Sequence, residues 1–381
     1  MTKTFKYELI ECEERVWDDW EDFTQTQTAD LISYLRNNPA EHLTVKIHFT
    51  YTSEGTTWLI NGKWFPDAIH KFAHKYSIPL SNITFRSGSA NIQKSYDAWH
   101  LLYAPNDDKM IVEFENFGFA LYGRANRYFS ELEFTTTDNA PTGLRSHKYN
   151  CFNRNMLGHR QKFMLAMHEN KLIDTETAMT SFHYWGNGVD DMPMYPVPEE
   201  LASQLPIQYD IKGDWQTAFD ELFRIDPDHH GGDWNKVGDY RYIYENCYFT
   251  ITTESSECFG LADYHRDPAV NEYMREFHRE MFITEKTTRP MLNLHPQILY
   301  CSTGTLDYLK SLGYKTFSNY WNEDYDSEVN PDKKLSLMID TIKDVSSKSL
   351  EELHEMYWDM MPILKHNQEL LLSQKAINWN A

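Results

Sequence analysis

The segment that follows the apolar pair at 282–283 brings a hydroxyl and three charged side chains close together. Thr284, Glu285, Lys286 and Arg289 share this stretch, which is predicted to open a helix. A carboxylate can accept hydrogen bonds from both hydroxyls of a ribose, and an adjacent Lys or Arg can neutralise a diphosphate. N–H groups at a helix start add to such an anion site. The spacing favours a nucleotide site as one interpretation, with a solvated helix start as the plainer one.

A second cluster joins a predicted strand to a predicted helix through Asn153, Arg154, His159 and Arg160. The chain has 36 basic and 57 acidic residues, a net charge of −21, so grouped arginines stand out as an anion site. Next to a helix start they would form a phosphate cradle. Salt bridges to neighbouring carboxylates are the alternative interpretation of the same residues.

Two carboxylates that follow strand-like segments are the candidates for acid–base chemistry. Glu254 comes directly after 248–253, and Glu54 follows 43–51. Ligands of an open α/β sheet bind at the carboxyl ends of its strands, which is where such residues lie. Glu54 can then act as a general base on a hydroxyl, whereas loop polarity is the default explanation for both residues.

The elements that must position these side chains alternate between strand and helix patterns. Strand-like runs rich in β-branched and aromatic residues occur at 43–51, 82–88, 148–154, 178–184, 248–253 and 297–301. Helix-like runs lie between them. One opens at Pro66 and carries Ile69, Phe72, Ala73 and Tyr76 at helical spacing. This alternation predicts an α/β fold with parallel sheets covered by helices.

The length of 381 residues suggests two domains. Gly and Pro collect between 186 and 240, which indicates an irregular connection. A capping box formed by Ser349 and Glu352 opens the last predicted helix. We therefore predict an N-terminal Rossmann-like domain over 1–190, a linker over 191–240, a second domain over 241–360, and a C-terminal helix and tail over 361–381.

Composition excludes several classes of protein. The chain has no apolar stretch of about 18 residues and its start lacks the pattern of a secretory signal, so we expect no membrane partner and a cytoplasmic location. Five widely spaced cysteines indicate reduced thiols rather than a disulfide framework. Neither glycine-rich phosphate-loop pattern occurs. The acidity disfavours nucleic acid as a partner.

Two groups of motifs resemble known glycosyltransferases. Tyr248–Ser255, Phe282–Lys286 and His295–Leu299 are similar to the donor-binding half of α1,3-fucosyltransferase-type GT-B enzymes. The stretch from 282 to about 326 more closely resembles a glycosyltransferase-like family of viruses and phages, and 149–181 matches the pattern of the same family.

The resemblance implies a GT-B fold, in which two Rossmann-like domains face a cleft that the C-terminal helix closes. It implies transfer of a sugar from a UDP- or GDP-linked donor to a glycan or another hydroxyl acceptor, in the host cytoplasm if the protein is viral, without a cofactor or an essential metal. Glu285 would bind the ribose and Lys286 the diphosphate, assisted by Arg154 or Arg160. Glu254 would take the place of the fucosyltransferases' strand-end glutamate. The expected donor-binding set is Asn153, Arg154, Arg160, Thr284, Glu285, Lys286 and Arg289, and the expected catalytic set is Glu54 and Glu254.

Two groups of residues have the composition of a metal site. Asp324 and Asp326 form the Asp-x-Asp pattern that holds Mn²⁺ or Mg²⁺ in another class of glycosyltransferases, the GT-A enzymes. Their place near the C-terminus favours a loop cap instead. The second group is the Asp-His-His run at 228–230 with Asp233, but neither a His-x₃-His helix nor a Cys pair supports it.

Three alternatives to a GT-B transferase stay open. A GT-A enzyme would use Asp324 and Asp326 with a metal. A non-catalytic, virion-associated protein with a degenerate fold would bind nucleotides or glycans without turnover. A phage enzyme that glycosylates DNA bases is the third, and the net charge of −21 counts against it.

Overall fold

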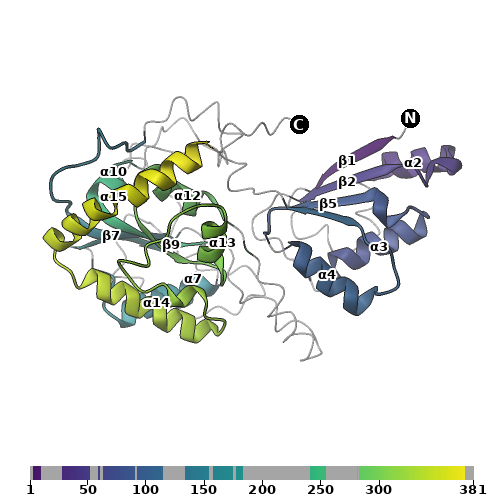
Figure 1. Ribbon diagram of the computed structural model, residues 1–381. Coiled ribbons are helices and arrows are strands. Elements are labelled where there is room, and N and C mark those ends of the chain that lie inside the picture. The colour runs from purple at the N-terminus through teal and green to yellow at the C-terminus, as the bar shows by residue number, and fades with distance from the viewer. Residues whose placement is uncertain are drawn as a thin grey trace, which may run out of the picture. The chain divides into compact units, whose positions relative to one another are not determined.

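Two four-stranded parallel sheets form the framework of the chain (Figure 1). The computed structural model describes residues 3–9, 28–51, 59–60, 63–90, 92–114, 134–153, 158–174, 177–182, 241–254, 281 and 283–373. The chain divides into two compact units, residues 1–117 with 256–282 and residues 118–255 with 283–381. Each unit has its own hydrophobic core, and the predicted α/β class with Rossmann-like sheets is confirmed.

The first unit contains a sheet with the strand order β1-β2-β5-β6. Its strands are β1 (Thr4–Leu9), β2 (Lys46–Tyr51), β5 (Ile83–Ser87) and β6 (Ile111–Phe114). Its helices are α2 (Ala29–Asn37), α3 (Phe65–Lys75) and α4 (Ile92–Tyr103), with the short elements η1 (Pro39–Glu41), β3 (Leu59–Ile60), β4 (Lys63–Trp64) and η2 (Leu80–Asn82). The spatial order of the strands follows the chain order. Right-handed crossovers that all advance in one direction place their helices on one face, and α3 and α4 lie on the same face (Figure 1).

The core of the first unit is built from alternate strand residues and from the apolar faces of its helices. Helix α3 buries Ile69, Phe72 and Ala73, as its sequence spacing predicts. The same helix buries His70, whose ring lies 4.8 Å from that of Trp99 on α4, centroid to centroid. The packing of α3 against α4 therefore fixes the position of a histidine.

The second unit contains a sheet with the strand order β10-β9-β7-β8. Its strands are β7 (His147–Asn153), β8 (Ala178–Phe182), β9 (Cys247–Thr253) and β10 (Gln297–Tyr300). Its helices are α7 (Gly158–Glu169), α10 (Arg241–Asn246), α12 (Glu285–Leu292), α13 (Thr305–Ser311), α14 (Pro331–Ser346) and α15 (Leu350–Ser373), with the 3₁₀ turn η3 (Asp324–Asp326). Helices α7 and α14 cover one face of this sheet, and α10, α12 and α15 cover the other (Figure 1). Every residue of β9 and β10 is buried, as expected for parallel strands covered on both faces.

The order of the strands reverses between β7 and β9. The chain passes from β7 to β8 on one side, and then to β9 and β10 on the other side of β7. This is the doubly wound arrangement of Rossmann-like sheets. The crevice outside the carboxyl ends of the strands at such a reversal is where ligands of these folds bind.

The domain boundary predicted at residue 190 is corrected by the sheets. Strands β7 and β8 pair with β9 and so belong to the second unit, not to an N-terminal domain over 1–190. The strand and helix patterns of 147–182 are local, and they do not reveal which distant strand β7 will join. The predicted linker over 191–240 lies outside the described residues. Helix α15 runs unbroken from Leu350 to Ser373, so no boundary falls at 361.

Within the described ranges, the structure contains no helix that combines the length and the apolar character needed to span a membrane.

Candidate functional site

The carboxyl ends of β7, β9 and β10 bring together most of the residues that the sequence singled out. Asn153 is the last residue of β7, and Glu254 directly follows β9. Arg160 lies in the first turn of α7, and Thr284 is the N-cap of α12. The predicted clusters around 153–160, 254 and 284–289 therefore meet at the reversal point of one sheet. Glu54 and Arg154 lie outside the described residues, as does the side chain of Glu285.

Glu254 is completely buried, and its carboxylate binds the start of α12. It accepts a hydrogen bond from the Thr284 N–H at 3.0 Å and one from the Thr284 hydroxyl at 2.6 Å, and it also accepts from the Thr287 hydroxyl. A carboxylate is favoured at this end of a helix by the N–H groups and by the helix dipole. Glu254 is thus a positioning residue. Its carboxylate is buried and bonded to the protein itself, and its catalytic role stays a prediction from the sequence.

Thr284, which is buried, holds the partly exposed Lys286 at the start of α12. The Thr284 hydroxyl oxygen accepts the Lys286 N–H at 3.2 Å, which caps the helix. The Lys286 ammonium lies 3.3 Å from the same oxygen, so this half-buried charge is held over the first turn of α12. Arg289, one turn further along, is also half-buried. Lys286 lies at the helix start that the sequence predicts, whereas Arg289 lies in the last turn of α12.

Asn153 and Arg160 brace the junction between β7 and β9. The Thr253 hydroxyl donates to the Asn153 side-chain oxygen, and the Arg160 guanidinium donates to the Thr253 carbonyl at 3.3 Å. Both side chains are almost completely buried. Their contact with a donor stays a prediction from the sequence. The Arg160 charge makes the electrostatic potential more positive at the carboxyl edge of the sheet, because low-dielectric surroundings screen a charge only weakly.

His159 is a buried, neutral hydrogen-bond donor beside Glu254. Its Nε2 lies 3.0 Å from the Glu254 carbonyl oxygen, so that nitrogen carries the proton. Burial, and secondly the neighbouring Arg160 charge, lower the pKa of His159 to about 3, although the bond to the Glu254 carbonyl opposes them. The end of β9 is therefore anchored to both α7 and α12.

A further buried cation, Lys334 of α14, lies at the carboxyl end of β10 and was missed by sequence reasoning. Its ammonium donates to the Cys301 carbonyl and lies 3.5 Å from the Thr303 hydroxyl oxygen. Thr253 and Tyr300 are neighbours in register, so Lys334 and Arg160 bind the ends of adjacent strands. The sequence did carry a signal for this burial. Lys334 lies four residues before Met338, so both fall on the inner face of a predicted helix.

Asp326 of the Asp-x-Asp pair caps a loop through its hydrogen bonds to residues 304–306. Asp326 is buried, its carboxylate accepts the Leu306 N–H at 3.0 Å, and its carbonyl accepts the Gly304 N–H at 2.8 Å. Burial raises the pKa of the Asp326 carboxyl to about 6. Asp324 is exposed. The other predicted metal group, 228–230 with Asp233, lies outside the described residues.

Sequence reasoning also missed a histidine pair in the first unit. His70 and His74 are four residues apart on α3, and Asp107 contacts both. The signal was present, because the helix opened by Pro66 had been predicted and a His-x₃-His spacing within it is visible in the sequence.

Comparison of the chain with protein-family models, with curated proteins and with solved structures finds no match. The resemblance to glycosyltransferases therefore stays a prediction, and the class that the fold defines is an α/β protein with Rossmann-like parallel sheets.

Proposed function

We propose that the chain is a glycosyltransferase that binds a nucleotide-sugar donor at the carboxyl edge of its second sheet. The observation that carries the proposal is the place of Lys286, held over the start of α12 beside the strand-order reversal. Diphosphates bind at such edges in α/β folds because a helix dipole and fixed cations meet there. The sequence resemblance adds the finer GT-B architecture and the sugar-transfer chemistry to this proposal.

The proposed chemistry relies on fixed positive charge at the leaving group. When the bond between the sugar and the diphosphate breaks, negative charge develops on the phosphate oxygens. Lys286 and Arg289 stabilise that charge from α12, and the buried Arg160 and Lys334 add to the positive field. Charges that are already in place cost no reorganisation during the reaction. The donor step therefore needs no metal in this proposal.

Glu254 contributes by fixing the start of α12 against the end of β9. Its bonds to Thr284 hold the residue that in turn positions Lys286. The ribose contact is assigned to Glu285 and the activation of the acceptor hydroxyl to Glu54, both as predictions from the sequence. The donor is UDP- or GDP-linked, and the acceptor is a glycan or another hydroxyl compound.

The first experiment is a thermal-shift panel of UDP, GDP, CMP, dTDP and their sugars, with and without EDTA. A ligand that binds only the folded protein raises the melting temperature by mass action. We expect one nucleotide to stabilise the protein regardless of EDTA, and Lys286→Ala to weaken its binding at least tenfold. Lys343→Ala, at an exposed position of α14, is the matched control and should bind as the parent does.

Catalysis is then tested with the nucleotide-sugar that raises the melting temperature, by measuring release of its nucleoside diphosphate. A panel without any shift, from protein that is folded by circular dichroism, contradicts the donor site. Tight binding of a nucleotide-sugar with no turnover, across a panel of acceptors, contradicts the transferase and favours the non-catalytic binding protein.

A further inference from the structure

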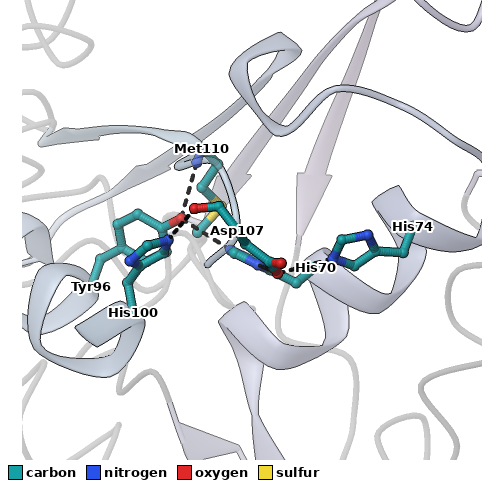
Figure 2. Close-up of polar contacts among 6 residues, drawn as sticks. All are labelled: His70, His74, Tyr96, His100, Asp107 and Met110. Atoms are coloured by element: carbon teal, nitrogen blue, oxygen red, sulfur yellow. Dashed lines mark hydrogen bonds and ion pairs between the residues drawn. The ribbon is translucent and has the colours of Figure 1, made fainter. Parts of the chain in front are cut away.

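Three potential metal ligands of the first unit converge on one point (Figure 2). Helix α3 places His70 and His74 one turn apart on the same face. Asp107, in the loop after α4, lies between them. Its Oδ2 is 3.0 Å from His70 Nδ1 and 2.9 Å from His74 Nε2. The three ligand atoms all lie within 4.8 Å of one another.

We propose that His70 Nδ1, His74 Nε2 and the Asp107 carboxylate bind a divalent transition-metal ion, with Zn²⁺ the ion that fits best. Zinc takes imidazole nitrogen and carboxylate oxygen at about 2.1 Å, so ligand atoms of a tetrahedral site lie about 3.4 Å apart. The two nitrogen–oxygen distances are close to that separation. Both distances are shorter than that separation, so the ligand atoms move apart when an ion binds, and the partly exposed Asp107 and exposed His74 side chains have room to do so.

The groups behind the trio orient it as the partners of metal ligands do. His70 Nε2 lies 3.0 Å from the buried Tyr96 hydroxyl, which also accepts the Met110 N–H at 3.0 Å. A hydrogen bond to the second ring nitrogen fixes the ring of a metal-binding histidine and leaves the first nitrogen free to bind. The Tyr96 contact holds the His70 ring with Nδ1 toward Asp107 (Figure 2).

The loop that carries Asp107 is fixed in the same way. The Asp107 N–H donates to the Ala104 carbonyl at 3.0 Å, and the Asp107 carbonyl accepts from His100 Nε2 at 3.0 Å. Two of the three ligands, His70 and Asp107, are therefore held by their own hydrogen-bond partners before any ion binds. Preorganisation of this kind is what a metal site needs for affinity.

The exposure of the trio gives an ion a way in and leaves a position for a further ligand. The exposed fraction of the side chain is 4% for His70, 29% for Asp107 and 60% for His74. One side of the site therefore faces solvent. Three protein ligands and one open position are the arrangement in which zinc holds a water molecule or a substrate group.

The test is zinc binding by the full chain, measured by titration calorimetry and by metal content after dialysis. We expect one Zn²⁺ per chain. His74→Ala and Asp107→Asn should each weaken binding at least tenfold. His74 is exposed, so its replacement leaves the core intact, whereas His70 is buried and its variant is avoided.

His168→Ala, at another helical and partly exposed histidine on α7, is the matched control and should bind zinc as the parent does. Absence of zinc binding by the parent chain overturns the proposal. Equal zinc affinity of the parent and folded His74→Ala overturns it as well, because the ion then binds elsewhere.

Discussion

The carboxylate of Glu254 accepts hydrogen bonds from both the backbone N–H and the hydroxyl of Thr284, at 3.0 and 2.6 Å. These two residues, 30 positions apart in the chain, join the end of the central strand β9 to the start of α12. The contact is completely buried at Glu254, so no water can replace a lost partner there. The stability of this junction is therefore measurable by substitution of either residue.

Glu254→Gln should destabilise the protein by about 2–3 kcal/mol, because an amide nitrogen would face hydroxyls and an N–H group that need an acceptor. Urea unfolding measures the loss. Glu355→Gln, at an exposed position of α15, should change stability by less than about 0.5 kcal/mol. Equal unfolding midpoints for the two variants would refute the structural role of Glu254.

Thr284→Ala should lose both the helix cap and a hydrogen bond to the carboxylate, a cost of about 2 kcal/mol. Thr284→Ser retains the hydroxyl and should recover most of that loss. The same urea experiment distinguishes them. The double variant with Glu254→Gln should lose less stability than the sum of the two single-variant losses, because both substitutions remove the same interaction. Strict additivity would show that the residues act independently.

His159 should make the protein less stable as the pH falls below neutrality. Its pKa is about 3 in the folded protein, against an ordinary value near 6.5 in the unfolded chain. The unfolded chain therefore takes up the proton first. The contribution of the neutral His159 to the free energy of unfolding is complete above pH 6.5. It is lost progressively as the pH falls toward 3. Between pH 7 and pH 5 the loss is about 2 kcal/mol.

The His159 contribution is isolated by comparison with His159→Gln at each pH. The buried His295, whose pKa is also lowered, mainly by burial, is present in both proteins and cancels. The stability of the parent should fall more steeply than that of the variant between pH 7 and pH 5. Parallel curves for the two proteins would contradict a buried neutral His159.

Three buried cysteines should resist alkylation while the protein is folded. Cys151, Cys247 and Cys301 are buried, and burial raises the pKa of each thiol, to about 12 for Cys151 and Cys301. The thiolate is the reactive form. Iodoacetamide at pH 8, followed by peptide mass spectrometry, should label these three only after addition of denaturant. Rapid labelling of any of them in buffer would contradict the packing around it.

The sequence predicts those features that depend on neighbours along the chain. The spacing of Ile69, Phe72 and Ala73 identifies the buried face of α3, because helical periodicity is a local property. The position of Glu254 at a strand end is local too. Whether its carboxylate faces a ligand or its own protein depends on Thr284, and the intervening chain gives no periodic signal for that pairing.

Features that join distant segments could not be predicted in this way. Strand β7 was identified, but its neighbour β9 follows some hundred residues later, as the register of Asn150 with Thr250 shows. The spacing of His70 and His74 is compatible with two metal ligands, whereas Asp107 lies beside them only because α3 and α4 pack together. In each case the prediction would have required knowledge of tertiary contacts, which local sequence patterns do not provide.

The two strand orders have a consequence for folding of the chain during its synthesis on the ribosome. The first sheet pairs strands in the order in which they are made, so its last partner is present once residue 114 has emerged. In the second sheet, β7 lacks its neighbour β9 until residue 253 is made, and β9 lacks its neighbour β10 until residue 300. Pairings between distant segments form slowly, because a long loop must close first. The strands of the first sheet can thus pair early in synthesis, although residues 256–282 complete its unit only later. The edge of β7 that pairs with β9 stays open while about a hundred further residues are made.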